Sequence, residues 1–202
     1  MYIIVAIVGY FLGSIPTGYL VGKLLCGIDI RQFGSKNIGT TNMFRTLGPR
    51  PAAMVLIVDV LKGVAAVAFA LYYADADIMA QIVAGVLSVI GHNYSCWLGF
   101  KGGRGVATSL GVVIMLMPMT SLLVFIIWAV IVYATRYVSL GSITGAACTP
   151  LLAWHFGYDE KIQILGVVMA VLVIAGHKDN IKRLLDGNEN KIKAGSMDNL
   201  KK

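Results

Sequence analysis

Long apolar segments alternate with short polar stretches along the chain. The fourth apolar segment, residues 106–133, exceeds the about 20 residues that one membrane span needs, so it is either one tilted helix or two short ones. Met117 and Pro118 lie near its middle, and proline favours a break there. The pattern predicts an all-α protein with membrane-spanning helices. The apolar segments are residues 3–25, 52–73, 78–98, 106–133, 141–156 and 162–175.

Composition places the chain among integral membrane proteins. Hydrophobic residues make up 57% of it and charged residues 13%, and the mean hydropathy is +0.77. Residues 1–22 carry no charge, so the first segment lacks the basic start of a signal peptide and is expected to remain as a helix. Pro16 is expected to break this segment, either by kinking the helix or by opening a gap for a lipid chain. The three cysteines form no CxxC pair or Cys/His cluster, so no disulfide framework, metal or other cofactor is expected.

The positions of the basic residues decide between six and seven spans. If the fourth segment is broken, all but two of the 17 Lys and Arg residues lie on one side, the exceptions being Lys62 within a span and Lys161 on the other side. If it is unbroken, the basic residues divide evenly. Because basic loops stay in the cytoplasm, we predict seven spans, some short, with the N-terminus outside and the C-terminus cytoplasmic. One membrane-embedded domain is expected over residues 1–202, with residues 192–202 as a flexible basic tail.

Three polar, glycine-rich stretches interrupt the apolar sequence, at residues 29–50, 91–105 and 176–191. All three fall on the predicted cytoplasmic side. Attraction to anionic lipid headgroups accounts for the lysines of the C-terminal tail. It does not account for cations set among glycine and asparagine, so the three stretches are candidates for binding an anionic ligand.

The second stretch has the composition of a phosphate-binding loop. Lys101 and Arg104 lie among four glycines, and a helix is predicted to start near Gly105. Glycines let successive N–H groups turn toward one point, and a helix N-terminus adds positive potential. The alternative is a flexible loop with ordinary topological charges. The four glycines are Gly99, Gly102, Gly103 and Gly105.

The first and third stretches contain further candidates. In the first, short polar side chains precede Arg45 and are suited to bind hydroxyls and phosphate oxygens, although they are also typical of a capped surface turn. In the third, His177, Asn180 and Arg183 follow at steps of three, so that a helix would place them on one face. The alternative for His177 is a structural hydrogen bond. The polar residues of the first stretch are Ser35, Asn37, Thr40, Thr41 and Asn42.

Two charged residues, Asp59 and Lys62, fall within the second apolar segment. Ionisable residues inside a membrane are functional candidates by default. Their spacing of three also allows a salt bridge on one helical face. We prefer the salt bridge, because burying either charge alone is costly.

Taken together, three motifs resemble the bacterial membrane glycerol-3-phosphate acyltransferases that use acyl phosphate as donor. They are GSKNIGTTNMFRTLG (34–48), GHNYSCWLGFKGGRGVATSLG (91–111) and HKDNIKRLLDGNE (177–189), supported by residues 13–20, 59–63 and 136–143. The chain departs from the family pattern GSGNIGATN at Lys36, where a glycine is usual, and at Thr40, and it has Arg104 where lysine is frequent. Lys36 puts in question whether the backbone at this position has the positive φ that glycine favours. Arg104 puts in question whether the substrate affinity and the reaction rate equal those of the family.

The resemblance implies a fold and a reaction. It implies seven spans in the plasma membrane, with the motif loops on the cytoplasmic face and the bilayer as surroundings. The implied reaction transfers a long-chain acyl group from acyl phosphate to the 1-hydroxyl of sn-glycerol 3-phosphate, which gives lysophosphatidate and phosphate. An enzyme that supplies acyl phosphate is a possible partner; no nucleic acid is expected. The alternative is a transporter for a phosphorylated solute, but the polar motifs cluster on one face and no inverted repeat is visible.

The resemblance also implies roles for residues. The proton of the attacking hydroxyl goes either to His177 or to a phosphate oxygen of the donor. Catalytic roles are expected for Ser35, Arg45, Arg104, His177 and Asn180. Substrate binding is expected for Asn37, Thr41, Asn42, Lys101, Gly102, Gly103, Ser142, Arg183 and Glu189.

Overall fold

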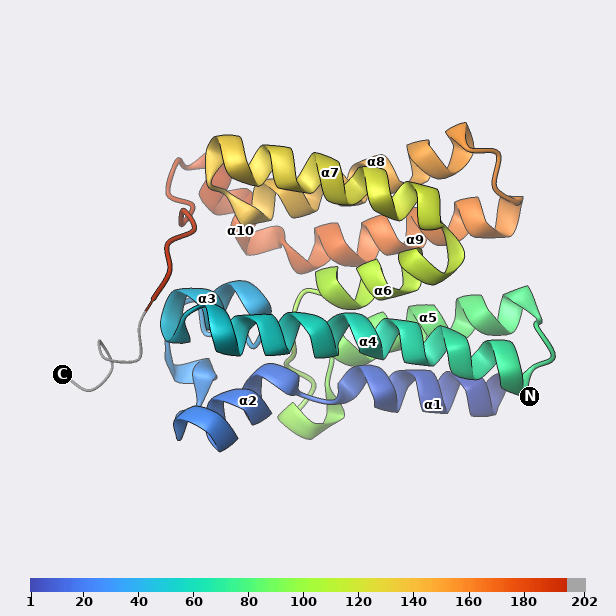
Figure 1. Ribbon diagram of the computed structural model, residues 1–202, viewed down its shortest axis with the longest axis horizontal. Helices are drawn as coiled ribbons and strands as arrows, with labels where there is room; N and C mark the ends of the chain where they lie inside the picture. Colours follow the sequence, from blue (N-terminus) through green and yellow to red (C-terminus); the bar gives the residue numbers. More distant parts are fainter. Residues whose placement is uncertain (196–202) are drawn as a thin grey trace.

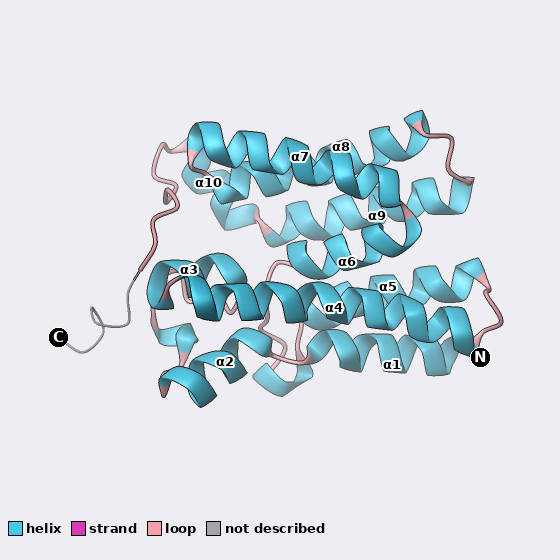
Figure 2. Cartoon of the chain, viewed as in Figure 1, coloured by secondary structure: helices cyan, strands magenta, loops and turns pink. Residues whose placement is uncertain are grey.

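The computed structural model describes residues 1–195. This part of the chain contains helices and no strand, which confirms the all-α prediction (Figure 2). The α-helices are α1 (Tyr2–Ser14), α2 (Thr17–Cys26), α3 (Thr40–Leu47), α4 (Pro49–Tyr73), α5 (Ile78–Asn93), α6 (Val106–Leu116), α7 (Pro118–Thr135), α8 (Val138–His155), α9 (Glu160–Gly176) and α10 (Lys178–Leu185). Two short 3₁₀ helices are η1 (Ile30–Gln32) and η2 (Cys96–Leu98).

The helices form two groups that run along the long axis of the molecule (Figure 1). Helices α1 to α5 make one group and α7 to α10 the other, and α6 lies between them in contact with both α4 and α7. The two groups also meet where α5 packs on α9. Residues of α4, α6 and α7 line the candidate site.

Both predicted helix breaks are present. Helix α6 ends at Leu116 and α7 begins at Pro118, and the chain reverses its direction between them (Figure 1). Helix α1 ends at Ser14 and α2 begins at Thr17, just after Pro16. Proline lacks the N–H that continues a helix and its ring clashes with the preceding turn. As a result α1 and α6 are short, at roughly 20 Å and 17 Å from a rise of 1.5 Å per residue.

Three helical segments are long and apolar enough to cross a membrane. They are Tyr2–Cys26, taken with its break, Pro49–Tyr73 and Pro118–Thr135, and α9 with α10 makes a fourth if the bend of 63° between them is allowed. The N-terminus and the α4–α5 and α8–α9 turns lie at one end of the molecule, and α3, α10 and the α7–α8 turn lie at the other (Figure 1). The count of seven spans and their orientation stay predictions.

The predicted salt bridge in the second apolar segment is confirmed. Lys62 Nζ lies 2.6 Å from Asp59 Oδ1, and both side chains are buried. Lys62 also donates to the backbone carbonyl of Ile15 at 2.6 Å, so that it joins α4 to the break between α1 and α2. The carbonyl of Ile15, which also accepts from the N–H of Thr17 at 2.9 Å, is thereby bound to α4 at the break between the two helices.

Close backbone contacts bring α4 and α6 together. A Cβ atom at Gly63 would meet the carbonyl oxygen of Thr108, and one at Gly111 would meet that of Val60. Only glycine permits this approach, which sets the position of the N-terminus of α6 relative to α4.

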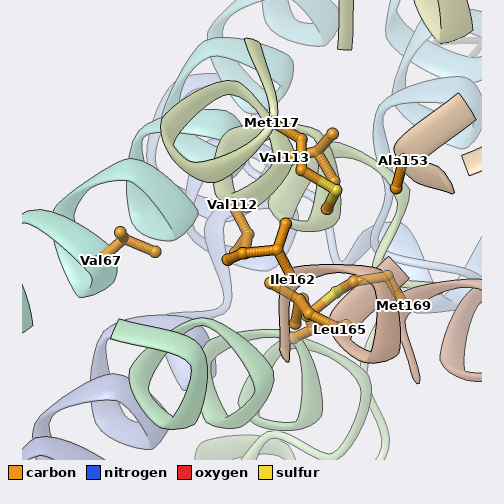
Figure 3. Close-up of a cluster of buried hydrophobic side chains, with 9 residues drawn as sticks. Val67, Val112, Val113, Met117, Ala153, Ile162, Leu165 and Met169 are labelled. Carbon is orange, nitrogen blue, oxygen red and sulfur yellow. The ribbon is translucent and has the colours of Figure 1, made fainter. Parts of the chain in front are cut away.

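A cluster of buried apolar side chains fills the space beyond α6 (Figure 3). Val113 and Met117 come from α6 and its end, and Ile162, Leu165 and Met169 come from α9. Their exposed fractions are at most 5%. This cluster closes the interior at the end of the molecule that carries the N-terminus.

The end of the described chain is attached to both helix groups. The N–H of Ile192 donates to the carbonyl of Arg136, and the N–H of Gly195 donates to that of Phe44. Residues 192–195, predicted as the start of a flexible tail, are therefore hydrogen bonded to the protein body. The rest of that predicted tail, residues 196–202, lies outside the described residues.

Candidate active site

A cavity of about 410 Å³ opens between the two helix groups. All three polar stretches contribute to its lining, through Arg45 of the first, Arg104 of the second and His177 of the third. Ten of the fourteen residues predicted for the site line the cavity. They are Ser35, Asn37, Thr41, Asn42, Arg45, Arg104, Ser142, His177, Asn180 and Glu189.

The remaining four predicted residues lie outside the cavity lining. They are Lys101, Gly102, Gly103 and Arg183. The N–H of Gly102 donates to the carbonyl of Asn93 at 3.0 Å, and that of Gly103 to the carbonyl of His92 at 2.9 Å. The expectation that these N–H groups form an open phosphate cradle is therefore wrong, because they close the end of α5. Gly103 must be small for another reason, since a Cβ there would meet the ring of His92.

The side chain of Asn42 organises the first polar loop. Its Oδ1 accepts from the N–H of Ser35 at 2.9 Å, and its Nδ2 donates to the carbonyls of Asn37 at 2.8 Å and Phe33 at 3.1 Å. The side-chain amide of Asn42 is thus occupied by hydrogen bonds to the loop backbone. These bonds hold the loop in a shape that places Ser35 and Asn37 in the cavity lining. Lys36 has a φ of 58°, so the chain keeps the left-handed turn with a lysine where glycine is usual in the family.

Positive potential at the cavity comes from Arg104 and the start of α6. Gly105 precedes that helix with a φ of 77°, and Gly105, Val106 and Ala107 line the cavity. The first N–H groups of a helix have no partner within it and favour an anion. Burial lowers the pKa of Arg104, yet an arginine stays charged at neutral pH. This end of the second stretch, and not its glycine pair, is suited to hold a phosphate.

His177 is held in one tautomer by a backbone bond. Its Nδ1 lies 2.7 Å from the carbonyl oxygen of Val173. Because a carbonyl can only accept, Nδ1 carries the hydrogen, and Nε2 of the neutral ring has a free lone pair. His177 is buried at the bend between α9 and α10 and lines the cavity. The ring can accept a proton from a group placed there.

Glu189 joins three elements at the mouth of the cavity. Its carboxylate accepts from Asn180 at 2.8 Å, from Arg183 at 2.8 Å and from Ser139 at 3.0 Å. Burial by itself would raise the pKa of Glu189, but these hydrogen bonds hold that pKa below its ordinary value of 4.5. Arg183, predicted to face a ligand, binds this carboxylate, and Glu189 fixes the orientation of Asn180.

Some polar atoms in the cavity have no partner among the residues that the structure describes. They include Nε of Arg45 and Oδ1 of Asn180, as well as the hydroxyls of Thr40 and Ser109. Arg45 also donates from Nη2 to the carbonyl of Asn190 at 2.6 Å. Unpartnered buried polar groups cost free energy, so these atoms are available to a polar ligand.

Apolar side chains line the inner part of the cavity and open it toward the lipid side. Leu56 of α4 and Phe125 of α7 both line it while being 42% and 50% exposed. Val106, Leu110 and Val113 of α6 form the wall between them. One cavity thus joins a cationic polar mouth to an apolar interior with a lateral opening.

Sequence reasoning missed several lining residues. Ser139 lies three residues before Ser142 on α8, and this spacing was a usable signal. Asp59 and His92 also line the cavity, but they were not missed: the sequence makes Asp59 a functional candidate, with its salt bridge to Lys62 preferred, and His92 is expected to support the second loop. Trp128 of α7 carried no signal, because α7 is apolar all round and its sequence does not mark the face that meets the cavity.

Comparisons with known proteins agree with this geometry. Residues 3–187 match the family described as glycerol-3-phosphate acyltransferase. The chain is 45% identical over 188 residues to the glycerol-3-phosphate acyltransferase of Fusobacterium nucleatum subsp. nucleatum, which covers 91% of this chain and 94% of the relative. It is 46% identical over 192 residues to the glycerol-3-phosphate acyltransferase of Carboxydothermus hydrogenoformans, and this match covers 95% of this chain and 97% of the relative.

Solved structures give the same result. The glycerol 3-phosphate form of PlsY (YgiH), an integral membrane glycerol 3-phosphate acyltransferase, matches with a TM-score of 0.89 and 38% identity over 100% of this chain and 99% of that chain. Its lysophosphatidic acid form matches with a TM-score of 0.87 and 38% identity over 94% of each chain. The resemblance inferred from the motifs is confirmed, and the chain belongs to the glycerol-3-phosphate acyltransferase family.

Proposed function

We propose that this acyltransferase transfers a long-chain acyl group from acyl phosphate to the 1-hydroxyl of sn-glycerol 3-phosphate. The observation that carries the proposal is the single cavity with a cationic mouth and an apolar, laterally open interior. A water-soluble dianion fits the mouth. An acyl chain gains ~0.8 kcal/mol per buried CH₂ and stays in the apolar part or the bilayer. The matching PlsY structures, which hold glycerol 3-phosphate and lysophosphatidic acid, support an acceptor and a product of this kind.

Glycerol 3-phosphate binds at the mouth in this proposal. Arg45 neutralises its phosphate, with Nε free for a further hydrogen bond. Ser35 and Asn180 contribute a hydroxyl and a free amide oxygen for the glycerol hydroxyls. His177 lies beside them in the lining and offers Nε2.

The phosphate of the acyl donor lies against Arg104 and the N-terminus of α6. These groups stabilise the charge that grows on the phosphate as it leaves. Thr41 and Ser142 also line the cavity, although the Ser142 hydroxyl donates to the carbonyl of Val138 at 3.0 Å. The acyl chain then lies along the apolar wall of α6.

The reaction forms one bond and breaks one. The 1-hydroxyl oxygen attacks the acyl carbon, the bond between that carbon and the bridging phosphate oxygen breaks, and inorganic phosphate leaves. The hydroxyl proton goes either to Nε2 of His177 or to an oxygen of the departing phosphate. Because phosphate is already a good leaving group, positioning and charge stabilisation supply most of the rate.

We place the site on the cytoplasmic face of the plasma membrane, in a protein of seven spans. The basic loops support this orientation. Acyl phosphate comes from an enzyme that forms it on the same side. A transporter for a phosphorylated solute would need a path through the protein, and the apolar cluster of Figure 3 argues against one.

The test is an assay on the purified protein in detergent. It is incubated with glycerol 3-phosphate and palmitoyl phosphate, and lysophosphatidate and phosphate are both measured. Parallel reactions contain acyl-CoA as donor or no acceptor. We expect equal amounts of both products, only with acyl phosphate and acceptor. Phosphate release without acceptor would indicate a hydrolase, and turnover with acyl-CoA would contradict the proposed donor.

A further inference from the structure

The inner end of the cavity is formed by three side chains from three helices. Val113 of α6, Thr149 of α8 and Met169 of α9 are the lining residues farthest along each helix from the polar mouth. The hydroxyl of Thr149 donates to the carbonyl of Gly145 at 3.0 Å, so it is satisfied within α8. We call these three residues the floor.

The floor lies at a similar depth on two independent helices. Gly105 and Val113 on α6, and His177 and Met169 on α9, are separated by eight residues, which a rise of 1.5 Å per residue makes ~12 Å. Carbon chains with bonds of about 1.5 Å and angles near 111° advance about 1.25 Å per carbon. The distance from Arg104 to the floor therefore suits about ten carbons.

The floor is closed from behind by packed side chains. Val113 and Met169 belong to the buried apolar cluster, together with Leu165 and Met117 (Figure 3). Leu165 is 1% exposed and does not line the cavity. A straight chain that reaches the floor cannot go farther, and additional carbons must turn through the opening beside Leu56 and Phe125.

We propose that Val113, Thr149 and Met169 determine how many carbons of the acyl donor are held in the cavity, and thereby set its chain-length preference. This inference rests on the proposed function, since it takes a long-chain acyl phosphate as the donor. Each carbon up to about the tenth gains contact with protein. Carbons beyond it enter lipid, where they gain nothing over the free donor in the bilayer.

The experiment measures kcat/KM for octanoyl, decanoyl, dodecanoyl and myristoyl phosphates. Wild type is compared with Met169→Ala, which deepens the floor, and Thr149→Leu, which raises it. For each variant, the ratio of kcat/KM between two donors is divided by the same ratio for wild type. The unequal partitioning of the donors into detergent then cancels. Leu165→Ala is the control, because Leu165 lies on the same helix and in the same cluster but outside the lining.

We expect Met169→Ala to raise the dodecanoyl-to-decanoyl ratio about twofold, because the added carbons gain a few van der Waals contacts in protein that is packed more densely than lipid. Thr149→Leu is expected to lower the decanoyl-to-octanoyl ratio by a similar factor. Leu165→Ala is expected to lower the melting temperature without changing either ratio. If Met169→Ala does not fold, Met169→Val replaces it with a smaller expected change.

Three outcomes overturn the inference and can be told apart. Turnover with unchanged ratios in both floor variants means that the chain leaves sideways before it reaches the floor, and the proposed function stands. No turnover of any acyl phosphate by folded wild type overturns the proposed function and the floor with it. Equal shifts in Leu165→Ala and Met169→Ala would also contradict the inference, because they would reflect loosened packing.

Discussion

At the scale of single residues, the site is made of side chains whose other atoms are already engaged. Arg45 donates one N–H to Asn190 and keeps Nε free, and Asn180 donates to Glu189 and keeps Oδ1 free. Such partial engagement holds a side chain in place before substrate binds, which lowers the entropy lost on binding. Because one atom of each side chain is engaged and another is free, a substitution can remove the free atom while keeping the engaged one.

The two ring nitrogens of His177 are separable in this way. In His177→Asn, the amide nitrogen can replace Nδ1 in the bond to Val173, but nothing replaces Nε2. If Nε2 accepts the hydroxyl proton, we expect kcat to fall by about 10² or more, since general base catalysis contributes ~10²–10⁴. Steady-state kinetics with a thermal melting control check this. A loss within about threefold, in folded protein, would leave the donor phosphate as the base.

The carboxylate of Glu189 makes stability depend on pH. Since its pKa is lower in the folded protein than the ordinary 4.5, its contribution is full above that value and is lost as pH falls through the folded pKa. We expect the melting temperature of wild type to fall more steeply below pH 4.5 than that of Glu189→Gln. Melting curves in detergent between pH 3 and 7 measure it, and parallel curves would contradict the prediction.

At the scale of elements, helix α4 holds the break between α1 and α2 through one buried charge. Lys62→Met would leave Asp59 charged without its partner, and would leave the carbonyl of Ile15 with the N–H of Thr17 as its one remaining donor among the described residues. Breaking a buried pair costs about 3–5 kcal/mol. We expect a large drop in melting temperature, and a smaller drop when Asp59→Asn is added. If the double variant is no more stable than Lys62→Met, the pair does not account for the loss.

The contact between α4 and α6 is equally specific. In Gly63→Ala the new methyl meets the backbone of Thr108, so α6 must move, and with it the helix start beside Arg104. We expect a loss of about 1–3 kcal/mol from overpacking and a lower kcat/KM for the acyl donor. Gly166→Ala is the control, because its nearest neighbour is Pro150 Cα at 3.3 Å and neither residue lines the cavity or contacts the start of α6. Unfolding and kinetics are measured for both, and equal effects would contradict a special role of this contact.

At the scale of the whole molecule, α3, α10 and the α7–α8 turn lie at one end, and the N-terminus with the α4–α5 and α8–α9 turns lies at the other (Figure 1). Opposite ends should therefore react with an impermeant thiol reagent from opposite sides of the membrane. With Cys26, Cys96 and Cys148 replaced by serine, we expect Asp75→Cys to react in intact cells and Arg50→Cys only after lysis. Both residues are exposed. The reverse pattern would invert the topology, and reaction of both in intact cells would contradict α4 as a membrane span.

The amino-acid sequence by itself determined the helical membrane class, the breaks at Pro16 and Pro118, and most of the polar mouth. These are local properties: apolar length, a missing N–H, and polar side chains spaced along one loop or helix. The salt bridge of Asp59 and Lys62 was predictable for the same reason, since both lie on one helix face.

Only the tertiary structure decided how the parts are used. The N–H groups of Gly102 and Gly103 go to α5, and Arg183 goes to Glu189, so these predicted ligands do not face the cavity. The apolar wall and its opening arise where α4, α6 and α7 meet, although each of these helices is apolar on several faces. Hydrogen-bond partners and cavity walls depend on which distant segments pack together, and no spacing within one segment records that choice.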